Sequence, residues 1–223
     1  MSVKVVLKGE ISKNDISSLV DLDVIFDVSY RPGFTIVEAS GDDEDIFVNY
    51  LRERYVEGHL FADLTVGEAY YGRLVDVGKY GFGVFCDINS QKDVLISLNS
   101  LRELFGGRQS TREYVYSKGL IDGLCVKIDL IRVERGTEKV WGTINREWSD
   151  KYLKDGNIMV SKTSKEQILN ILNNSSFKNS VEIMDLCSDS FVLVCRGGVD
   201  PPGIVHLVGN RLRMARLGIV GEL

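Results

Sequence analysis

The sequence predicts an α+β protein in which a five-stranded barrel lies between two α-β-β-α halves that pack together. Two observations predict this class. Short β-rich runs separated by glycine and charged turns fill the middle of the chain, and both ends carry an amphipathic helix, two strands and a second helix. The expected domains are residues 1–62, residues 63–148 and residues 149–223, and a chain of 223 residues is long enough for three small ones.

The N-terminal half opens with a short apolar strand and continues with the helix, hairpin and helix. Ile16, Leu19 and Val20 recur at helical spacing and predict the first helix. Two strands and a second helix are expected at residues 23–30, 34–39 and 42–55.

The C-terminal half shows the same order of elements. Ile168 and Leu172 lie on the apolar side of a predicted helix, two strands follow, and Asp200 with the prolines after it predicts the start of the last helix. The first helices match at an offset of 152, and the later elements match at 157: Phe34 with Phe191, Val37 with Val194, Phe47 with Ile204, Leu51 with Val208 and Arg54 with Arg211. Because one such unit buries little surface alone, we expect the two copies to pack on each other or on the barrel.

The middle of the chain contains the barrel. Its five strands are expected at residues 68–77, 82–88, 93–98, 124–133 and 139–144. A short helix at residues 100–105, ended by two glycines, lies between the third and fourth strands. This order is that of the OB-fold.

The barrel segment also resembles the S1 RNA-binding domains. The matching stretches are Tyr71-Gly72-Arg73-Leu74, Phe82-Gly83-Val84-Phe85-Cys86-Asp87-Ile88, residues 92–99, Gly123-Leu124-Cys125-Val126-Lys127-Ile128, Val133-Glu134 and Lys139-Val140-Trp141-Gly142-Thr143-Ile144. The sequence departs from the family in having Ser97 in place of a binding-face histidine and Glu134 in place of an aspartate. The connections at residues 77–81 and 108–117 are longer than in the family.

The resemblance implies that one face of the barrel binds RNA. An aromatic ring on a sheet surface stacks on an exposed base for about 1–3 kcal/mol, and nearby cations neutralise phosphates. Single-stranded or loop RNA is the expected ligand because its bases are already accessible. The expected contact residues are Arg73, Lys79, Tyr80, Phe82, Phe85, Lys92, Ser97, Arg132, Glu134, Arg135 and Lys139. A second basic surface is expected on the C-terminal helix, from Arg211, Arg213 and Arg216.

Charge is distributed unevenly along the chain. Residues 1–62 hold 6 basic and 12 acidic side chains, residues 63–148 hold 12 of each, and residues 149–223 hold 9 and 8. Bulk electrostatics therefore do not favour tight, sequence-independent binding to duplex DNA, although local patches can bind a single strand.

Several classes of function find no support in the sequence. No apolar run approaches the ~18 residues of a membrane span, and the early lysines argue against a signal peptide, so a cytoplasmic protein is expected. The four cysteines show no C-x-x-C spacing and neither of the two histidines lies near one, so neither a metal nor another cofactor is expected. No nucleotide-binding or hydrolase motif occurs, and the protein is not expected to be an enzyme.

Three hypotheses remain open from the sequence. The first is an RNA-binding protein of translation, ribosome function or RNA metabolism. The second is a protein–protein module whose barrel docks on a ribosomal protein or on RNA polymerase. The third is a subunit of a nuclease or RNA-modifying complex, which has the least support because no catalytic constellation is visible. The whole-chain arrangement resembles an archaeal family of S1-like proteins, and this implies an archaeal cytoplasm without supplying a function.

Overall fold

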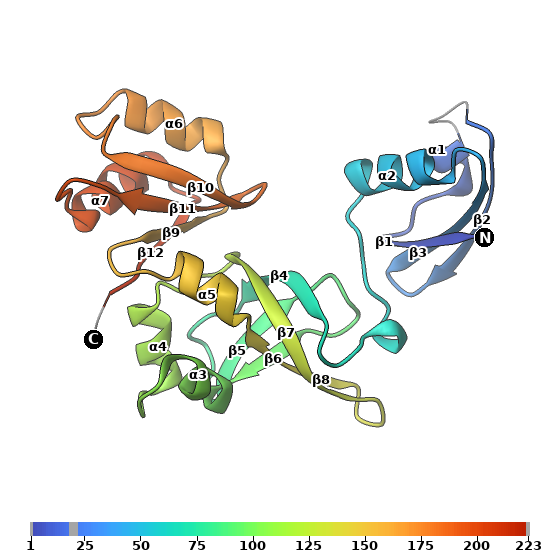
Figure 1. Cartoon of the computed structure of the whole chain (residues 1–223), viewed down its shortest axis with the longest axis horizontal. Helices are drawn as coiled ribbons and strands as arrows, with labels where there is room; N and C mark the ends of the chain where they lie inside the picture. The colour runs from blue at the N-terminus through green and yellow to red at the C-terminus, as the bar shows by residue number, and fades with distance from the viewer. Residues whose placement is uncertain (1, 18–21, 222–223) are drawn as a thin grey trace. The chain divides into compact units, whose positions relative to one another are not determined.

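The computed structural model describes residues 2–17 and 22–221, which form two compact units (Figure 1). The N-terminal unit is the chain up to Leu64 together with Ile88–Lys92. The barrel unit is Thr65–Asp87 together with the chain from Asp93 onward, so the barrel and the C-terminal half cluster as one body. Packing of the N-terminal half on the C-terminal half stays a prediction.

The N-terminal unit is a three-stranded antiparallel sheet with order β1-β3-β2 and two helices on one face. Ile16, Phe47 and Leu51 from the helices pack against Leu7 and Val37 of the sheet. The expected helix residues Leu19 and Val20 lie outside the described residues. The elements are β1 (Val3–Lys8), α1 (Lys13–Ser17), β2 (Val24–Arg31), β3 (Phe34–Gly41), α2 (Glu44–Arg54) and a 3-10 turn, η1 (Phe61–Asp63).

The middle of the chain forms a closed five-stranded barrel with strand order β4-β5-β6-β8-β7, in which only the β6–β8 pair is parallel. The expected mixed α+β fold with a barrel of OB type is confirmed. A second helix, α4, fills the long connection before β7, and a capping box of Ser110 and Glu113 starts it. The elements are β4 (Ala69–Val75), β5 (Gly83–Asp87), β6 (Val94–Ser97), α3 (Leu98–Phe105), α4 (Thr111–Ser117), β7 (Cys125–Glu134) and β8 (Lys139–Ile144).

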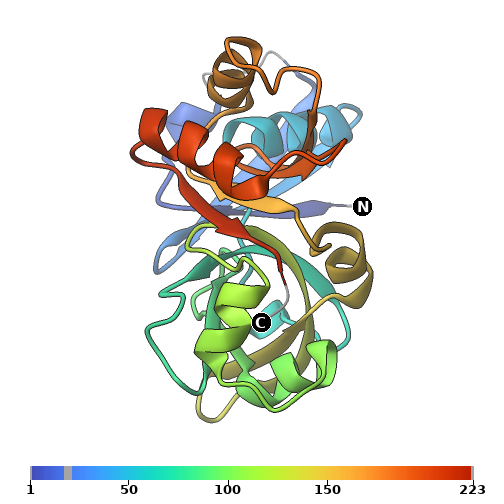
Figure 2. The same cartoon turned by 90° about the vertical axis from the view of Figure 1, so that its left-hand side faces the viewer.

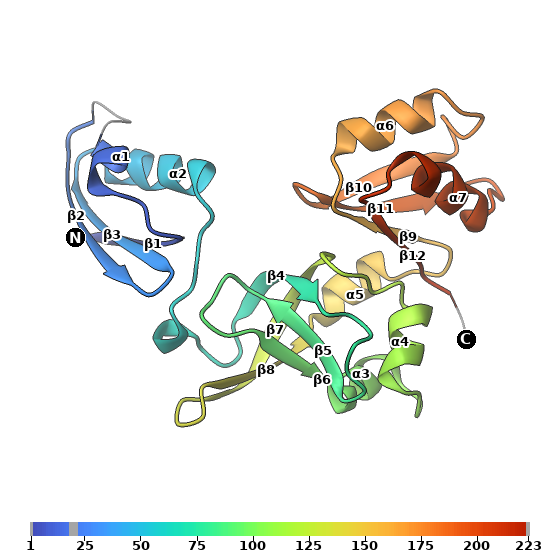
Figure 3. The same ribbon diagram turned by 180° about the vertical axis from the view of Figure 1, so that it is seen from behind.

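The C-terminal half is a four-stranded sheet of order β10-β11-β9-β12, covered on one face by two helices (Figures 1 and 3). As expected, the last helix starts after Asp200, whose carboxylate accepts the Gly203 N–H at 3.1 Å. The elements are α5 (Arg146–Tyr152), β9 (Ile158–Ser161), α6 (Lys165–Asn173), β10 (Val181–Cys187), β11 (Ser190–Cys195), α7 (Pro201–Arg211) and β12 (Arg216–Ile219).

The two halves share one topology. Both run β-α-β-β-α, and in both sheets the third strand lies between the first and the second, in the orders β1-β3-β2 and β9-β11-β10. Each copy therefore begins with a strand that precedes the α-β-β-α unit seen in the sequence. The C-terminal copy adds β12 as a further strand beside β9.

At an offset of 157 the matches between strands are wrong by one residue. The matches between helices align a buried residue of one half with a buried residue of the other. Phe34 belongs to a cluster with Leu60, on the sheet face away from the helices, but Phe191 packs in the core under α6 and α7. A shift of one residue exchanges the two faces of a strand, so Thr35 rather than Phe34 corresponds to Phe191. The two hairpin loops support the same alignment. Phe34 pairs with Arg31 across the first loop and Ser190 pairs with Cys187 across the second, so Ser190 corresponds to Phe34.

The expected basic surface on the C-terminal helix is also wrong in its geometry. The helix ends at Arg211, Arg213 lies in the following turn, and Arg216 begins β12 opposite Ser161 of β9. The chain leaves the helix here because residues 216–219 pair with β9 and complete the sheet, as the descending strand in Figure 2 shows. The three arginines are exposed but do not share a helical face.

Candidate nucleic-acid interface

Three aromatic rings gather at the start of β5. The Tyr80 ring lies 5.3 Å from Phe82 and 5.5 Å from Phe85, and Phe82 and Phe85 meet edge to face at 6.1 Å. Phe82 is 54% exposed and is among the large apolar side chains that the structure leaves in solvent. The sequence predicted these three residues as neighbours, and the structure brings them together.

The aromatic surface continues across three strands of the barrel. Phe85 is the cross-strand partner of Leu95, and Leu95 is the partner of Trp141. Their neighbours along the strands, including Val84 and Val94, are buried in the barrel, so the alternation of a β-strand turns Phe85, Leu95 and Trp141 outward. We call Tyr80, Phe82, Phe85, Leu95 and Trp141 the aromatic face.

Trp141 and Leu95 were not among the residues expected from the sequence. A signal was present, because Trp141 stands between Val140 and Gly142 on a strand whose buried positions alternate. What the sequence could not show is the parallel pairing of β6 with β8, which places Trp141 beside Leu95.

A glycine lets the first two strands of the aromatic face approach each other. A Cβ atom added at Gly83 would overlap the carbonyl oxygen of Ile96 and meet the Leu95 side chain at 3.0 Å. Gly83 therefore allows β5 to lie directly against β6.

Two cations contact the aromatic face, and each already has a carboxylate partner. The Arg132 guanidinium lies 4.8 Å from the Trp141 ring centroid and 2.7 Å from a Glu134 carboxylate oxygen. Lys79 lies 5.2 Å from the Tyr80 ring centroid and 3.0 Å from Asp76. These pairs are exposed, so each contributes little to stability and can be exchanged for a phosphate contact.

Glu134 holds its charge through its neighbours. The Thr137 hydroxyl, and then Arg132 and Lys139, lower the pKa of the Glu134 carboxyl from its ordinary value. Lys139 is the cross-strand partner of Glu134, and exposed Arg135 lies in the turn that joins β7 to β8. This end of the barrel therefore alternates positive and negative charge.

Three of the expected contact residues have other places in the structure. Ser97 caps α3, because its hydroxyl accepts the Ser100 N–H at 3.1 Å. Lys92 belongs to the N-terminal unit. Arg73 pairs with Asp189 in the β10–β11 loop, and so holds the C-terminal half on the barrel.

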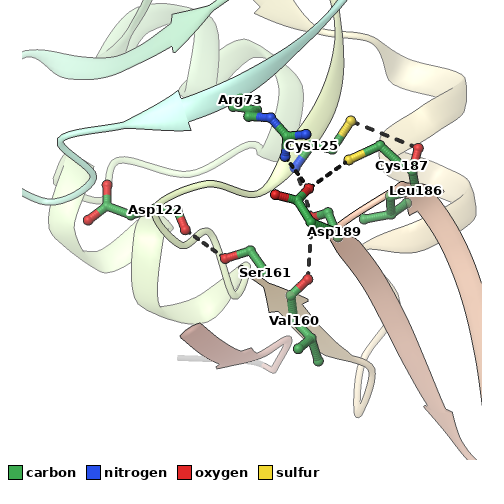
Figure 4. A network of polar contacts seen from close by, with 9 residues as sticks. Arg73, Asp122, Cys125, Val160, Ser161, Leu186, Cys187 and Asp189 are labelled. Carbon is green, nitrogen blue, oxygen red and sulfur yellow. Dashed lines mark hydrogen bonds and ion pairs between the residues drawn. The ribbon is translucent and has the colours of Figure 1, made fainter. Parts of the chain in front are cut away.

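Arg73 is part of a polar seam between the barrel and the C-terminal sheet (Figure 4). The Ser161 hydroxyl donates to the Asp122 carbonyl oxygen at 2.6 Å, and the Cys125 N–H donates to the Ser190 hydroxyl at 3.0 Å. Since these groups are at least half buried, their hydrogen bonds fix the orientation of the two sheets within the barrel unit.

Two thiols from opposite sides of the seam interact. The neighbouring Cys125 thiol, and then the Asp189 N–H and the charge of Arg73, lower the pKa of the Cys187 thiol from its ordinary value. The same interaction and burial raise the pKa of Cys125. Within residues 2–17 and 22–221, no three His, Cys, Asp or Glu side chains gather as metal ligands, and no helix is long and apolar enough to cross a membrane.

The solved structures that resemble the chain include two nucleic-acid-binding proteins. No protein-family model and no curated protein matches the chain. A protein assigned as an exosome complex RNA-binding protein is similar at 14% identity and a TM-score of 0.30, over 67% of this chain and 95% of its own. A multidomain protein with nucleic acid binding domains from Streptococcus pneumoniae is similar at 17% identity and a TM-score of 0.27, over 73% of this chain and 54% of its own. This chain thus spans about half the length of the second protein.

Proposed function

We propose that the protein is a non-catalytic RNA-binding protein that holds single-stranded or loop RNA on the aromatic face of its barrel. The observation that carries the proposal is the outward row of Phe85, Leu95 and Trp141, extended at one end by Tyr80 and by the exposed ring of Phe82. A run of rings on an OB-type barrel is the arrangement on which successive bases stack.

The charges around the aromatic face favour a single strand over a duplex. Lys79 and Arg132 lie against rings, where each can contact the phosphate beside a stacked base. Asp76 and Glu134 lie beside these cations and oppose the dense phosphate charge of a duplex. We expect stacking to supply most of the affinity and a few phosphate contacts to supply the rest.

Binding to labelled RNA tests the proposal. We expect a ten-nucleotide single strand to bind at least about tenfold tighter than a duplex of the same sequence, because only the single strand exposes its bases. With two to four phosphate contacts, the logarithm of affinity should fall with the logarithm of salt concentration at a slope between about −1.4 and −2.8. Fluorescence anisotropy over a salt series measures both quantities. Absence of binding at micromolar protein, or equal binding to the duplex, would contradict the proposal.

A protein partner is the second candidate for the same face. The ion pairs of Lys79 and Arg132 neutralise the cations that RNA would need, and Ser97 caps a helix where S1 domains carry a histidine. A ribosomal protein or a polymerase subunit would then cover the exposed rings. The RNA titration distinguishes the two candidates. In both cases we place the protein in the cytoplasm. An RNA ligand would place it in translation, ribosome function or RNA metabolism, and a protein partner would place it in the translation or transcription machinery.

A further inference from the structure

A groove lies within the barrel unit, between the barrel and the C-terminal sheet. Its volume is about 570 Å³, and four segments line it: the β4–β5 loop, α4, the turn after α4, and β12. The lining residues are Val77, Gly78, Arg112, Val115, Tyr116, Leu120, Ile121, Asp122, Arg216 and Leu217. The expected contact residues of the aromatic face are all absent from this lining.

Two arginines give the groove its charge. Neither Arg112 nor Arg216 forms an ion pair with another residue in the described part of the chain, unlike Lys79 and Arg132 on the aromatic face. The one carboxylate in the lining, that of Asp122, accepts the Val77 N–H at 2.8 Å and so holds the loop. The groove therefore presents two guanidinium groups that are available to an anion.

An aromatic ring stands beside the arginines. Tyr116 is 66% exposed, and the Arg112 guanidinium lies 5.8 Å from its ring centroid. Buried Val115 and Leu120 provide an apolar base for the groove. A stacking ring next to two cations suits a nucleotide, which offers a π-face and a phosphate together.

One loop, between β4 and β5, contributes residues to both the groove and the aromatic face. Gly78 lines the groove and Tyr80 follows it by two residues, so their Cα atoms are at most about 7.6 Å apart. The Thr111 hydroxyl donates to the Gly81 carbonyl oxygen at 2.7 Å, which ties the start of α4 to the same loop.

We propose that the groove is a second nucleotide subsite for the same RNA strand, with a phosphate between Arg112 and Arg216 and a base against Tyr116. This inference rests on the proposed function of the aromatic face. It adds a site formed by α4 and β12, two elements that were not expected from the sequence.

Oligonucleotides of two lengths test the subsite. A four-nucleotide RNA should occupy the aromatic face alone, and a ten-nucleotide RNA should reach the groove as well. For Arg112→Gln/Arg216→Gln we expect the Kd of the longer RNA to rise about tenfold and its salt slope to become shallower by about 0.7, since the phosphate held between the two arginines is no longer neutralised. The Kd of the shorter RNA should stay within twofold of the wild-type value. Arg211→Gln/Arg213→Gln removes the same charge from exposed positions outside the groove and should change neither Kd.

The outcomes separate the two proposals. If the longer RNA binds the groove variant as tightly as it binds the wild type, the subsite is overturned while the aromatic face stands. If neither RNA binds the wild type, the proposed function fails. If a glutamate-rich peptide displaces the longer RNA from the wild type but does not bind the groove variant, the groove is a site for acidic peptides and the inference is overturned.

Discussion

We expect replacement of both Phe82 and Phe85 with alanine to raise the Kd for a ten-nucleotide single-stranded RNA by at least about 30-fold. The estimate follows from stacking, which is worth about 1–3 kcal/mol for each base. Phe82 offers the most exposed ring of the aromatic face, and Phe85 connects that ring to Leu95 and Trp141. Anisotropy titrations at one fixed salt concentration measure the change.

Tyr71→Ala is the matched control for this pair. Tyr71 is an exposed ring on the same barrel, but it lies four positions along β4 from Val75, the cross-strand partner of Phe85. At the spacing of a β-strand this separation is about 13 Å. We expect its removal to change the Kd less than threefold. Equal losses in the control and the double variant, or an unchanged Kd in the double variant, would show that the aromatic face does not hold the RNA.

Leu74→Ala and Leu193→Ala should each lower the free energy of unfolding of the barrel unit by about 2–5 kcal/mol. Both leucines are fully buried, Leu74 in the barrel and Leu193 in the core under α6 and α7. Since the barrel and the C-terminal half form one compact unit joined by the polar seam, both substitutions should shift the same transition. Urea unfolding followed by circular dichroism measures the shift.

The control for these substitutions is Leu169→Ala, at an exposed position of α6. Its cost should stay below about 0.5 kcal/mol because it creates no cavity. Separate transitions for the barrel and the C-terminal half, each sensitive to only one of the buried leucines, would contradict a single cooperative unit.

The barrel could be predicted from the sequence because its signals are local. Alternating apolar residues and glycine turns placed all five strands within two residues of their observed ends. Tyr80, Phe82 and Phe85 are close in sequence as well as in space, so their cluster was also accessible. Ser110 and Glu113, which form the capping box of α4, were a local sequence signal for this helix, although the helix was not among the predicted elements.

The remaining features depend on contacts between residues that are distant in the chain. Arg73 and Asp189 are 116 residues apart, and the sequence alone does not show that Arg73 belongs to a seam. The pairing of β12 with β9 likewise removes Arg216 from a predicted helix and places it in the groove. In the repeat, the offset of 157 aligns buried residues of the helices, but it misaligns the strands by one residue. Side chains alternate between the two faces of a strand, so a shift of one residue exchanges the faces.

Photo-cross-linking can show whether bound RNA lies on the aromatic face. The full chain would be mixed with a ten-nucleotide RNA that contains 4-thiouridine, irradiated, and digested for mass spectrometry. We expect adducts on the segment from Tyr80 to Phe85 and on Trp141, and a loss of these adducts in Phe82→Ala/Phe85→Ala. Bound RNA whose adducts all fall outside the barrel would contradict this expectation.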